Sequence, residues 1–371
     1  MKAFEKNIRK VEPYVPGEQP QRKVIKLNTN ENPYPPAPGV TKALEEMDTD
    51  RFRLYPDPTA APLVNVLADF YHVNPDQVFV GVGSDDVLSM CFLTFFNSEK
   101  PIFFPDITYS FYSVWADLYR IPYECQKLDE DFKLVKEDYY KENGGVIFPN
   151  PNAPTGIYED LSVVEDIIAH NQDVIVIVDE AYIDFAGRSA LELIDKYDNL
   201  IVVQTFSKAR SMAGMRIGYA ISNPTLIKYL NDAKYSFNSY TMNQTSIVCG
   251  VEAVKDREYF ENGVRKIVET REWAKEELTK LGFTYLDSGS NFIFAKHPEY
   301  DAKELFEALK AHDIYVRFWG SERIEQYMRI SIGTREEMEQ LFAFLKEYMW
   351  RGSEQLQKFY TGGILWVQIS L

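Results

Sequence analysis

The chain has 371 residues, 45% of them hydrophobic, which is enough for two domains or for one large α/β domain with an appendage. Its formal net charge of −16 argues against binding to nucleic acid or to an anionic membrane, so any anionic ligand must be held by a local group of donors. Three scattered cysteines, four histidines without metal-ligand spacing and no apolar run of membrane-spanning length predict a cytoplasmic protein without disulfides, metal site or membrane span.

The first 40 residues are expected to form an extended arm rather than a domain. They contain the segments P-Y-V-P-G and L-N-T-N-E-N-P-Y-P-P-A-P, whose prolines exclude long helices. The asparagines of the second segment favour an arm that packs beside a binding site, although a tail lying along the surface accounts for the same composition.

From about residue 78 to residue 221, short apolar runs alternate with helix-length amphipathic segments. Several runs are apolar on both faces, which a mainly parallel sheet covered by helices requires. The expected strands cover residues 78–82, 101–104, 146–148, 174–178, 200–204 and 217–221. Ligands bind such sheets at the carboxyl ends of the strands, so the residues that follow each run are the candidate site residues.

Residues 223–285 are expected to be helical, and the segment beyond them alternates strands with helices. The expected strands cover residues 291–295, 314–318 and 327–332, and the helices lie near 302–311 and from the last strand to about 349. This alternation indicates a smaller α+β domain.

The chain is therefore divided into four parts. We expect an arm (1–40), a large cofactor-binding domain (41–260), a small C-terminal domain (261–349) and a tail of unassigned role (350–371). The tail ends in G-I-L-W-V-Q-I-S-L, which we interpret either as an extra strand or as an addition foreign to the natural chain.

Polar residues follow the first three runs. Ser84 ends the first strand and Asp85 begins an expected helix, whose free N–H groups could bind phosphate, although ordinary capping by serine or aspartate explains the same residues. The carboxylates of Asp85 and Asp86 oppose an anion, so their side chains are expected to point away from it.

Tyr109, after the second run, could stack on a planar ligand or simply pack. Asn152, within P-N-P-N-A-P-T-G, is either an amide donor to a ligand or part of a tight connection.

Asp179 and Tyr182 follow the fourth run in the segment D-E-A-Y. A carboxylate at the end of a fully apolar strand needs a cationic partner, and a protonated pyridine nitrogen is one. Tyr182, three residues on, could face the same site. A lone aspartate could instead cap a helix, but a lysine at the end of the next strand favours the first interpretation.

That lysine is Lys208, in T-F-S-K-A-R-S-M-A-G-M-R (205–216). A lysine after a buried strand is costly unless it is used, and its common uses are to bind phosphate or to form a Schiff base with an aldehyde cofactor. The chain contains neither G-x-x-x-x-G-K-S/T nor G-x-G-x-x-G. What remains are the parts that bind pyridoxal 5′-phosphate: a phosphate cup (Ser84, Ser207, Arg216), a ring stacker (Tyr109), a pyridinium partner (Asp179) and an amine (Lys208).

On these residues the chain resembles the fold type I pyridoxal-phosphate aminotransferases, and among them the histidinol-phosphate aminotransferases. The segments that carry the resemblance span roughly residues 8–349 and are L-N-T-N-E-N-P-Y, L-Y-P-D-P, G-S-D-D-V-L, P-T-G, V-D-E-A-Y-I-D-F, T-F-S-K-A-R-S-M-A-G-M-R-I-G-Y and M-R-I-S-I-G-T. The resemblance implies a homodimer with a mainly parallel central sheet, and transamination between L-histidinol phosphate and 2-oxoglutarate.

The resemblance also implies roles for residues at matching positions. Lys208 would form the Schiff base and carry the proton, Asp179 would pair with the pyridine nitrogen, and Tyr182 would bond the phenolic oxygen. The phosphate would be held by Ser84, the backbone of Asp85, Ser207, Arg216 and Tyr55 from the neighbouring subunit, with Tyr109 stacked on the ring. The implied substrate-binding residues are Arg329, for a carboxylate, and Arg317, for the substrate phosphate, with Tyr14 and Asn30 of the arm.

The sequence departs from the family at one position. The asparagine that usually precedes P-T-G and bonds the phenolic oxygen is here Ala153. Either Asn152 takes its place, or Tyr182 serves alone.

Three other functions fit parts of this pattern. An aromatic aminotransferase and a threonine-phosphate decarboxylase use the same scaffold. A regulator that binds the cofactor without turnover belongs to a different class, and it is disfavoured because the arm is too short and too rich in proline for a DNA-binding module.

Overall fold

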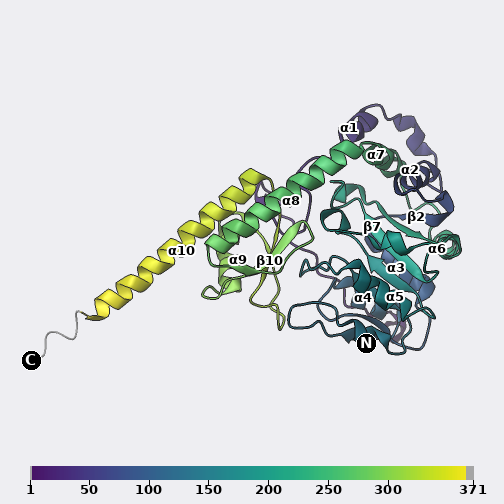
Figure 1. Cartoon of the computed structure of the whole chain (residues 1–371). Coiled ribbons are helices and arrows are strands. Elements are labelled where there is room, and N and C mark those ends of the chain that lie inside the picture. Colours follow the sequence, from purple (N-terminus) through teal and green to yellow (C-terminus); the bar gives the residue numbers. More distant parts are fainter. Residues whose placement is uncertain (1, 365–371) are drawn as a thin grey trace, which may run out of the picture.

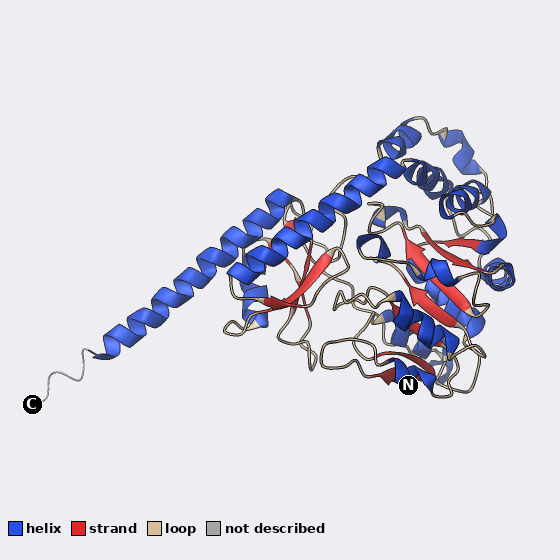
Figure 2. Cartoon of the chain, in the orientation of Figure 1, coloured by secondary structure: helices blue, strands red, loops and turns tan. Residues whose placement is uncertain are grey.

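The computed structural model describes the backbone of residues 2–364 and the side chains of residues 2–351. Two sheets of different construction organise these residues (Figure 2). The larger has seven strands in the order β2-β8-β7-β6-β5-β3-β4. Its strands are β2 (Val78–Gly81), β3 (Ile102–Pro105), β4 (Tyr123–Gln126), β5 (Val146–Pro149), β6 (Val176–Asp179), β7 (Leu200–Thr205) and β8 (Gly218–Ser222).

This sheet is mainly parallel, as predicted. β8 alone runs antiparallel to its two neighbours, β2 and β7. All six expected strands are present within two residues of their predicted limits. β4 was missed because it is an edge strand: three of its four residues, Tyr123, Glu124 and Cys125, are exposed, so no apolar run marks it.

Helices cover both faces of the large sheet. Successive strand residues point to opposite faces, so Ile147 and Ile177 are buried against helices α3, α4 and α6, and Phe148 and Val178 against helix α5. The helices before and around this sheet are α1 (Pro38–Glu45), α2 (Ala61–Tyr71), α3 (Ser84–Phe95), α4 (Phe111–Tyr119), α5 (Leu161–Ala169), α6 (Pro224–Phe237) and α7 (Gln244–Lys255).

The smaller sheet is antiparallel, in the order β12-β13-β10-β9. Its strands are β9 (Thr284–Tyr285), β10 (Phe292–Lys296), β12 (Arg317–Phe318) and β13 (Met328–Ser331), accompanied by α9 (Ala302–Ala311). Helix α8 (Arg257–Lys280) runs from the large sheet to the small one and lies beside α10 (Arg335–Ile364) (Figure 1). The domain boundary predicted at residue 260 falls in the first turn of α8, and the division into domains stays a proposal.

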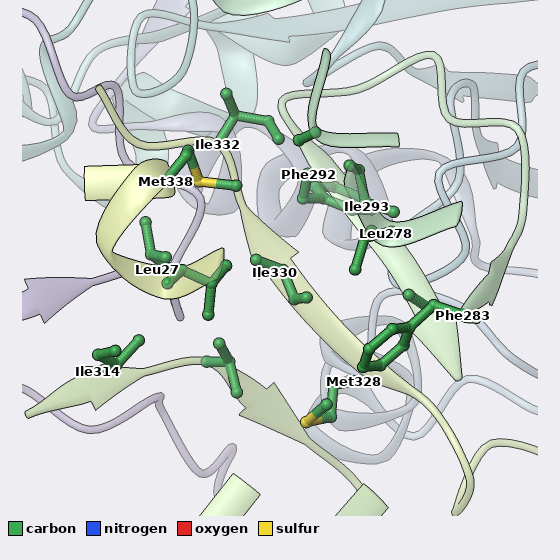
Figure 3. Close-up of a cluster of buried hydrophobic side chains, with 14 of the residues drawn as sticks. Leu27, Leu278, Phe283, Phe292, Ile293, Ile314, Met328, Ile330, Ile332 and Met338 are labelled. Carbon is green, nitrogen blue, oxygen red and sulfur yellow. The ribbon is translucent and has the colours of Figure 1, made fainter. Parts of the chain in front are cut away.

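The arm is tied to the small sheet. Its strand β1 (Ile25–Lys26) pairs in parallel with β11 (Ile314–Tyr315), so the single strand expected at 314–318 is in fact two, β11 and β12, with different partners. Leu27 enters the buried cluster formed by Ile330 and Met338 (Figure 3). The arm therefore packs beside the body of the protein, and its position is set by backbone pairing as well as by apolar contact.

The remaining elements are short. The 3-10 helices are η1 (Ala3–Asn7), η2 (Thr49–Arg53), η3 (Pro75–Gln77), η4 (Lys136–Tyr140), η5 (Ile183–Phe185), η6 (Ala190–Leu193) and η7 (Ala213–Met215). The final helix, expected to end near residue 349, continues to Ile364. Most of the apolar tail segment, interpreted above as a possible strand, lies outside the described residues. Among those described, no helix is both long and apolar enough to cross a membrane.

Candidate active site

A cavity of about 690 Å³ lies where the carboxyl ends of the large sheet face the small sheet and the arm. Seven of the predicted site residues line it: Tyr14, Asn30, Tyr109, Tyr182, Lys208, Arg317 and Arg329. Five cationic side chains line the cavity, against two carboxylates, in a chain whose net charge is −16. The lining is therefore suited to an anionic ligand.

Lys208 lies just past the end of β7 and points into this cavity. Its Nζ donates a hydrogen bond to the carbonyl of Thr29 in the arm at 3.1 Å and lies 5.7 Å from the centre of the Tyr182 ring. The amide of Asn32 donates to the carbonyls of Lys208 and Ala209. The arm thus fixes both ends of the lysine, its backbone and its amine.

Asp179 ends the neighbouring strand β6 and is 4% exposed. Its Oδ2 accepts a hydrogen bond from the Tyr112 hydroxyl at 2.8 Å, and its Oδ1 accepts one from the backbone of Ala181 at 3.2 Å. Burial raises the pKa of Asp179 to about 6, against the opposing effect of these bonds. No cation forms an ion pair with it among the described residues, so the carboxylate fits the protonated ring nitrogen of the predicted cofactor.

Arg216 and Ser207 come together at the amino end of α3. Arg216 Nη1 lies 3.4 Å from Ser207 Oγ, and Arg216 Nη2 forms an ion pair of 3.1 Å with Asp85. A Cβ on Gly83, whose φ is +88°, would lie 2.3 Å from Nη2, so only glycine leaves room for the guanidinium here. The Ser207 hydroxyl, the Arg216 guanidinium and the amino end of α3, whose first residue is Ser84, thus lie together, and their binding of a phosphate stays a prediction.

The orientation predicted for Asp85 is wrong. Its carboxylate was expected to point away from the anion site, but it contacts Arg216 and accepts a hydrogen bond from the Tyr109 hydroxyl at 2.7 Å. The guanidinium attracts the nearest carboxylate, and a ring hydroxyl completes its hydrogen bonding. Asp86 does turn away, because its Oδ2 accepts from the backbone N–H of Val82 at 2.9 Å.

Asn30 of the arm holds Tyr182. Its Nδ2 donates to the Tyr182 hydroxyl at 2.8 Å, and its Oδ1 accepts from Ser331 Oγ of β13 at 2.9 Å. The bond fixes the tyrosine hydroxyl at the cavity wall, with its own hydrogen free to donate. Arm, large sheet and small sheet meet in this chain of hydrogen bonds.

Asn152 is buried and joins its own loop to the segment that follows β3. Its Nδ2 donates to the Ile107 carbonyl at 2.9 Å and to Thr155 Oγ1 at 3.0 Å, and its Oδ1 accepts from Thr108. Both amide hydrogens are therefore used within the protein. Ala153, and not Asn152, lines the cavity. The geometry favours a loop-fixing role for Asn152, and its predicted cofactor contact stays a prediction.

Arg317 and Arg329 face each other across β12 and β13. Arg329 Nη2 donates to the Asn28 carbonyl at 2.9 Å, whereas its Nε is buried without a partner. Burial, together with the positive charge of Arg317, lowers the pKa of Arg329. Both guanidiniums lie over the Trp319 ring, at 5.3 and 5.1 Å. An unpartnered buried N–H beside a second guanidinium is suited to bind a carboxylate or a phosphate.

Tyr14 and Tyr55, both predicted site residues, lie in different surroundings. Tyr14 lines the cavity and stacks on Phe111 at 4.2 Å. Tyr55 is 81% exposed and stacks on Tyr240 at 4.5 Å, outside the cavity lining. Within one chain the structure does not bring Tyr55 to the other site residues.

Sequence reasoning missed Tyr112 and Asn32, which support Asp179 and Lys208. Tyr112 lies in the first turn of α4, three residues after Tyr109, and this nearness in the sequence was the one available signal. For Asn32 the asparagine cluster pointed to the arm as a whole, but nothing in the sequence assigned it a carbonyl partner 176 residues away.

Comparisons with known proteins agree with this geometry. The family model described as aminotransferase class I and II matches residues 22–345. A histidinol-phosphate aminotransferase of Lactococcus lactis subsp. cremoris (strain MG1363) is 51% identical over 94% of this chain and 98% of its own, and one of Clostridium botulinum (strain Kyoto / Type A2) is 50% identical over 91% and 96%. The solved structure of the Sinorhizobium meliloti histidinol-phosphate aminotransferase in complex with pyridoxal-5′-phosphate aligns with a TM-score of 0.79 and 25% identity, covering 88% of this chain and 91% of that one.

Proposed function

The chain belongs to the class I and II aminotransferases, and from that membership we propose that it transfers the amino group of L-histidinol phosphate to 2-oxoglutarate, a step of histidine biosynthesis. The observation that carries the proposal is that Asp179 and Lys208 follow adjacent strands. Lys208 lines a cavity with an excess of cationic side chains and is near enough for its charge to lower the pKa of Asp179. The identity of about half of all positions with histidinol-phosphate aminotransferases supports the choice of donor.

The residues present fit pyridoxal 5′-phosphate. Arg216, Ser207 and the amino end of α3 would hold its phosphate, and Tyr109 would cover its ring. When bound, the cofactor supplies the aldehyde carbon that takes the amino group and a ring that disperses the charge released at the donor carbon.

The protein's own groups then move and hold protons. Lys208 Nζ would be the base that removes the proton from the donor Cα and returns it to the carbon supplied by the cofactor's aldehyde, because its amine reaches into the cavity from the end of β7. Asp179 holds a proton at the ring nitrogen, and Tyr182, oriented by Asn30, donates to the phenolic oxygen. The Thr29 carbonyl accepts a hydrogen bond from the lysine amine and holds it at the cavity wall.

The small sheet binds the substrates. Arg317 and Arg329 together take the phosphate of the donor and, in the second half of the reaction, a carboxylate of the acceptor, since guanidinium forms paired hydrogen bonds with both. Tyr14, Tyr109 and Trp319 give the cavity aromatic faces against which an imidazole ring stacks. One cavity therefore serves two substrates that share only an anionic end.

A homodimer completes the proposed site. Large apolar side chains near Tyr55 are exposed in the single chain: Phe52 and Leu54 precede it at 55% and 53%, and Tyr240, which stacks on its ring, is 44% exposed. A second copy of the chain would bury them. We propose that this dimer brings the partner's Tyr55 to the cofactor phosphate, and that the enzyme acts in the cytoplasm.

The test is a coupled assay with the purified protein, pyridoxal 5′-phosphate, histidinol phosphate and 2-oxoglutarate. We expect glutamate to form at a rate proportional to enzyme. Glutamate formed from phenylalanine but not from histidinol phosphate would make the protein an aromatic aminotransferase. Carbon dioxide released from threonine phosphate without any keto acid would make it a decarboxylase.

A further inference from the structure

Arg323 joins the small sheet to the large one at the rim of the cavity. It lies in the rim loop, residues 319–327, between β12 and β13. Its Nη1 forms an ion pair of 3.0 Å with Asp106, which follows β3. Its Nη2 donates to the carbonyls of Leu128 and Asp129, at 2.9 and 2.8 Å, in the segment after β4. One guanidinium thus holds three groups of the large sheet's loops.

An apolar cluster lies beneath this guanidinium and combines the same two regions. Leu128 and Phe132 follow β4, whereas Ile324 and Tyr327 belong to the rim loop, and all are buried together. The Arg323 guanidinium lies 5.3 Å from the centre of the Phe132 ring, which meets the Tyr327 ring edge-on at 5.7 Å. The hydrogen bonds of Arg323 are therefore shielded on one side and are stronger than those of an exposed pair.

The backbone at both ends of this contact is strained. Arg323 has a φ of +71° and Phe132 a φ of +61°, in the left-handed region that side chains other than glycine, asparagine and aspartate rarely adopt. Such conformations persist only where the surroundings determine them. Two facing residues in this region indicate that the contact holds the backbone in place.

The contact belongs to the wall that binds the substrate anion. Asp106, Trp319 and Arg323 all line the cavity, and Trp319 lies against both Arg317 and Arg329. Arg323 donates three of the five N–H groups of its guanidinium to protein oxygens, and one of these oxygens is a carboxylate that neutralises its charge. Its role is therefore to hold the wall.

We propose that Arg323 is a positioning residue: with Asp106 it fixes the rim loop to the large sheet and so sets the distance between the substrate-binding arginines and Lys208. This inference rests on the proposed transamination of histidinol phosphate. When the loop is loosened, only a fraction of molecules hold the arginines where the donor's phosphate reaches them. The Michaelis constant of the donor then rises by the inverse of that fraction, while the rate of the bound complex changes little.

The test compares Asp106→Asn, Arg323→Lys, Arg323→Gly and the double variant Asp106→Asn/Arg323→Gly in the assembled, cofactor-loaded enzyme. Glycine adopts positive φ without strain, so this variant removes the guanidinium and leaves the fold intact. We expect the KM for histidinol phosphate to rise about 3-fold in Asp106→Asn and about 10-fold in Arg323→Gly, with kcat within about 2-fold. Arg323→Lys keeps the ion pair with Asp106 but not both hydrogen bonds to the carbonyls. Its KM for histidinol phosphate is expected to lie between those of Asp106→Asn and Arg323→Gly.

The double variant decides the question. If Asp106 acts through Arg323, the KM for histidinol phosphate in the double variant should equal that of Arg323→Gly alone. If the two residues act independently, their effects on KM would multiply to about 30-fold, which would overturn the proposal. Amide exchange in residues 319–325 gives a readout independent of activity, and we expect it to accelerate in both Arg323 variants. Lys100→Gln, which breaks the exposed ion pair with Glu142, is the matched control and should change neither measurement.

The same experiment separates this proposal from the assigned function. A wild-type enzyme that forms no glutamate from histidinol phosphate refutes the function. A wild-type enzyme that is active, with variants whose KM and loop exchange match the wild type, refutes the role of Arg323 alone.

Discussion

The two walls of the cavity are built differently. Asp179 ends one strand of the large sheet and pairs with Val203 of the next, and Lys208 lies just past the end of that next strand. Lys208 is near enough for its positive charge to lower the pKa of Asp179. Arg317 and Arg329 lie within strands of a small antiparallel sheet, and their position relative to the first wall depends on the arm and the rim loop. The backbone of the first wall is fixed by adjacent strands of one sheet, and the arm adds hydrogen bonds to Lys208. The second wall has no such neighbouring strand of the large sheet and is joined to the first by contacts between distant segments.

From this difference we infer separate roles for the first wall, with Asp179 and Lys208, and the second wall, with Arg317 and Arg329. A group that moves protons needs a fixed distance to the reacting atom, and the large sheet supplies it. A group that binds the anionic end of a substrate acts on how tightly the substrate is held, so displacement of the second wall changes affinity rather than the chemical step. Variants of the first wall should therefore lower kcat, and variants of the second should raise KM.

The largest effect is expected for Lys208→Ala. Turnover should fall by at least about 10³-fold, because the variant loses both the proton carrier and the covalent attachment of the cofactor. The measurements are the rate of glutamate formation and the visible absorbance of the bound cofactor. Lys100→Ala, which removes an exposed lysine elsewhere, serves as the control. A borohydride-reducible lysine linkage that survives in Lys208→Ala would contradict the assignment.

Asp179→Asn should lower kcat by on the order of 10²- to 10³-fold, as the removal of one preorganised electrostatic group does elsewhere. The same residue predicts a pH dependence. Burial raises its pKa to about 6, so without a cationic partner the carboxyl keeps its proton up to that pH.

Binding a protonated ring requires the ionised form of Asp179. Cofactor affinity should therefore be constant above pH 6 and weaken as the pH falls below it, by up to about tenfold per unit. Titration of the apoprotein with cofactor between pH 5 and pH 8 measures this slope. The dependence should vanish in Asp179→Asn, and a slope that persists there would assign it to another group.

The large sheet was the predictable part of the fold. Strands β5, β6 and β7 are apolar on both faces, so their sequences stand out as short unbroken runs. β4 is largely exposed, and β9 has only two residues, which leaves neither with a periodic signal. The pairing of β1 with β11 joins residues almost 290 positions apart, and no local pattern in either segment specifies it.

The site residues also divide into those that a local sequence pattern marks and those that it does not. The strand-end rule is enough to find Asp179 and Lys208 in the sequence, since each comes at or just after the end of a buried run. Arg317 and Arg329 came only from the resemblance to a family, because a mid-strand arginine in an antiparallel sheet is ordinarily a solvent-facing residue. Contacts such as Asn32 with Lys208, or Arg323 with Asp106, join segments far apart in the chain and depend on tertiary packing, which no local pattern encodes.

The second wall is tested by Arg329→Lys beside Arg317→Lys. Arg329 is the more buried and has an N–H without a partner, so we expect the KM of both substrates to rise about 10- to 100-fold in Arg329→Lys. Arg317 is less enclosed, and about 3- to 10-fold is expected for its variant. The dissociation constant of the cofactor should stay within about 2-fold in both. A fall in cofactor affinity would show that the walls are not independent.

The smallest effect on ligands is expected for Asn152→Ala, which distinguishes loop support from cofactor contact. Its two amide hydrogens are bonded to Thr155 in its own loop and to Ile107 after β3, so the variant leaves two oxygens with fewer donors and should lower the free energy of unfolding by about 1–3 kcal/mol. Cofactor affinity should change less than about threefold. Urea unfolding and cofactor titration measure the two quantities separately.

Ala153→Asn completes that comparison, because it places the amide found in the family at the residue that does line the cavity. If the Tyr182 hydroxyl holds the phenolic oxygen alone, the added donor should tighten cofactor binding severalfold, and it should do so equally in the Asn152→Ala background. A loss of affinity in Asn152→Ala that Ala153→Asn restores would instead show that Asn152 reaches the cofactor. The first wall would then depend on a loop as well as on its strands.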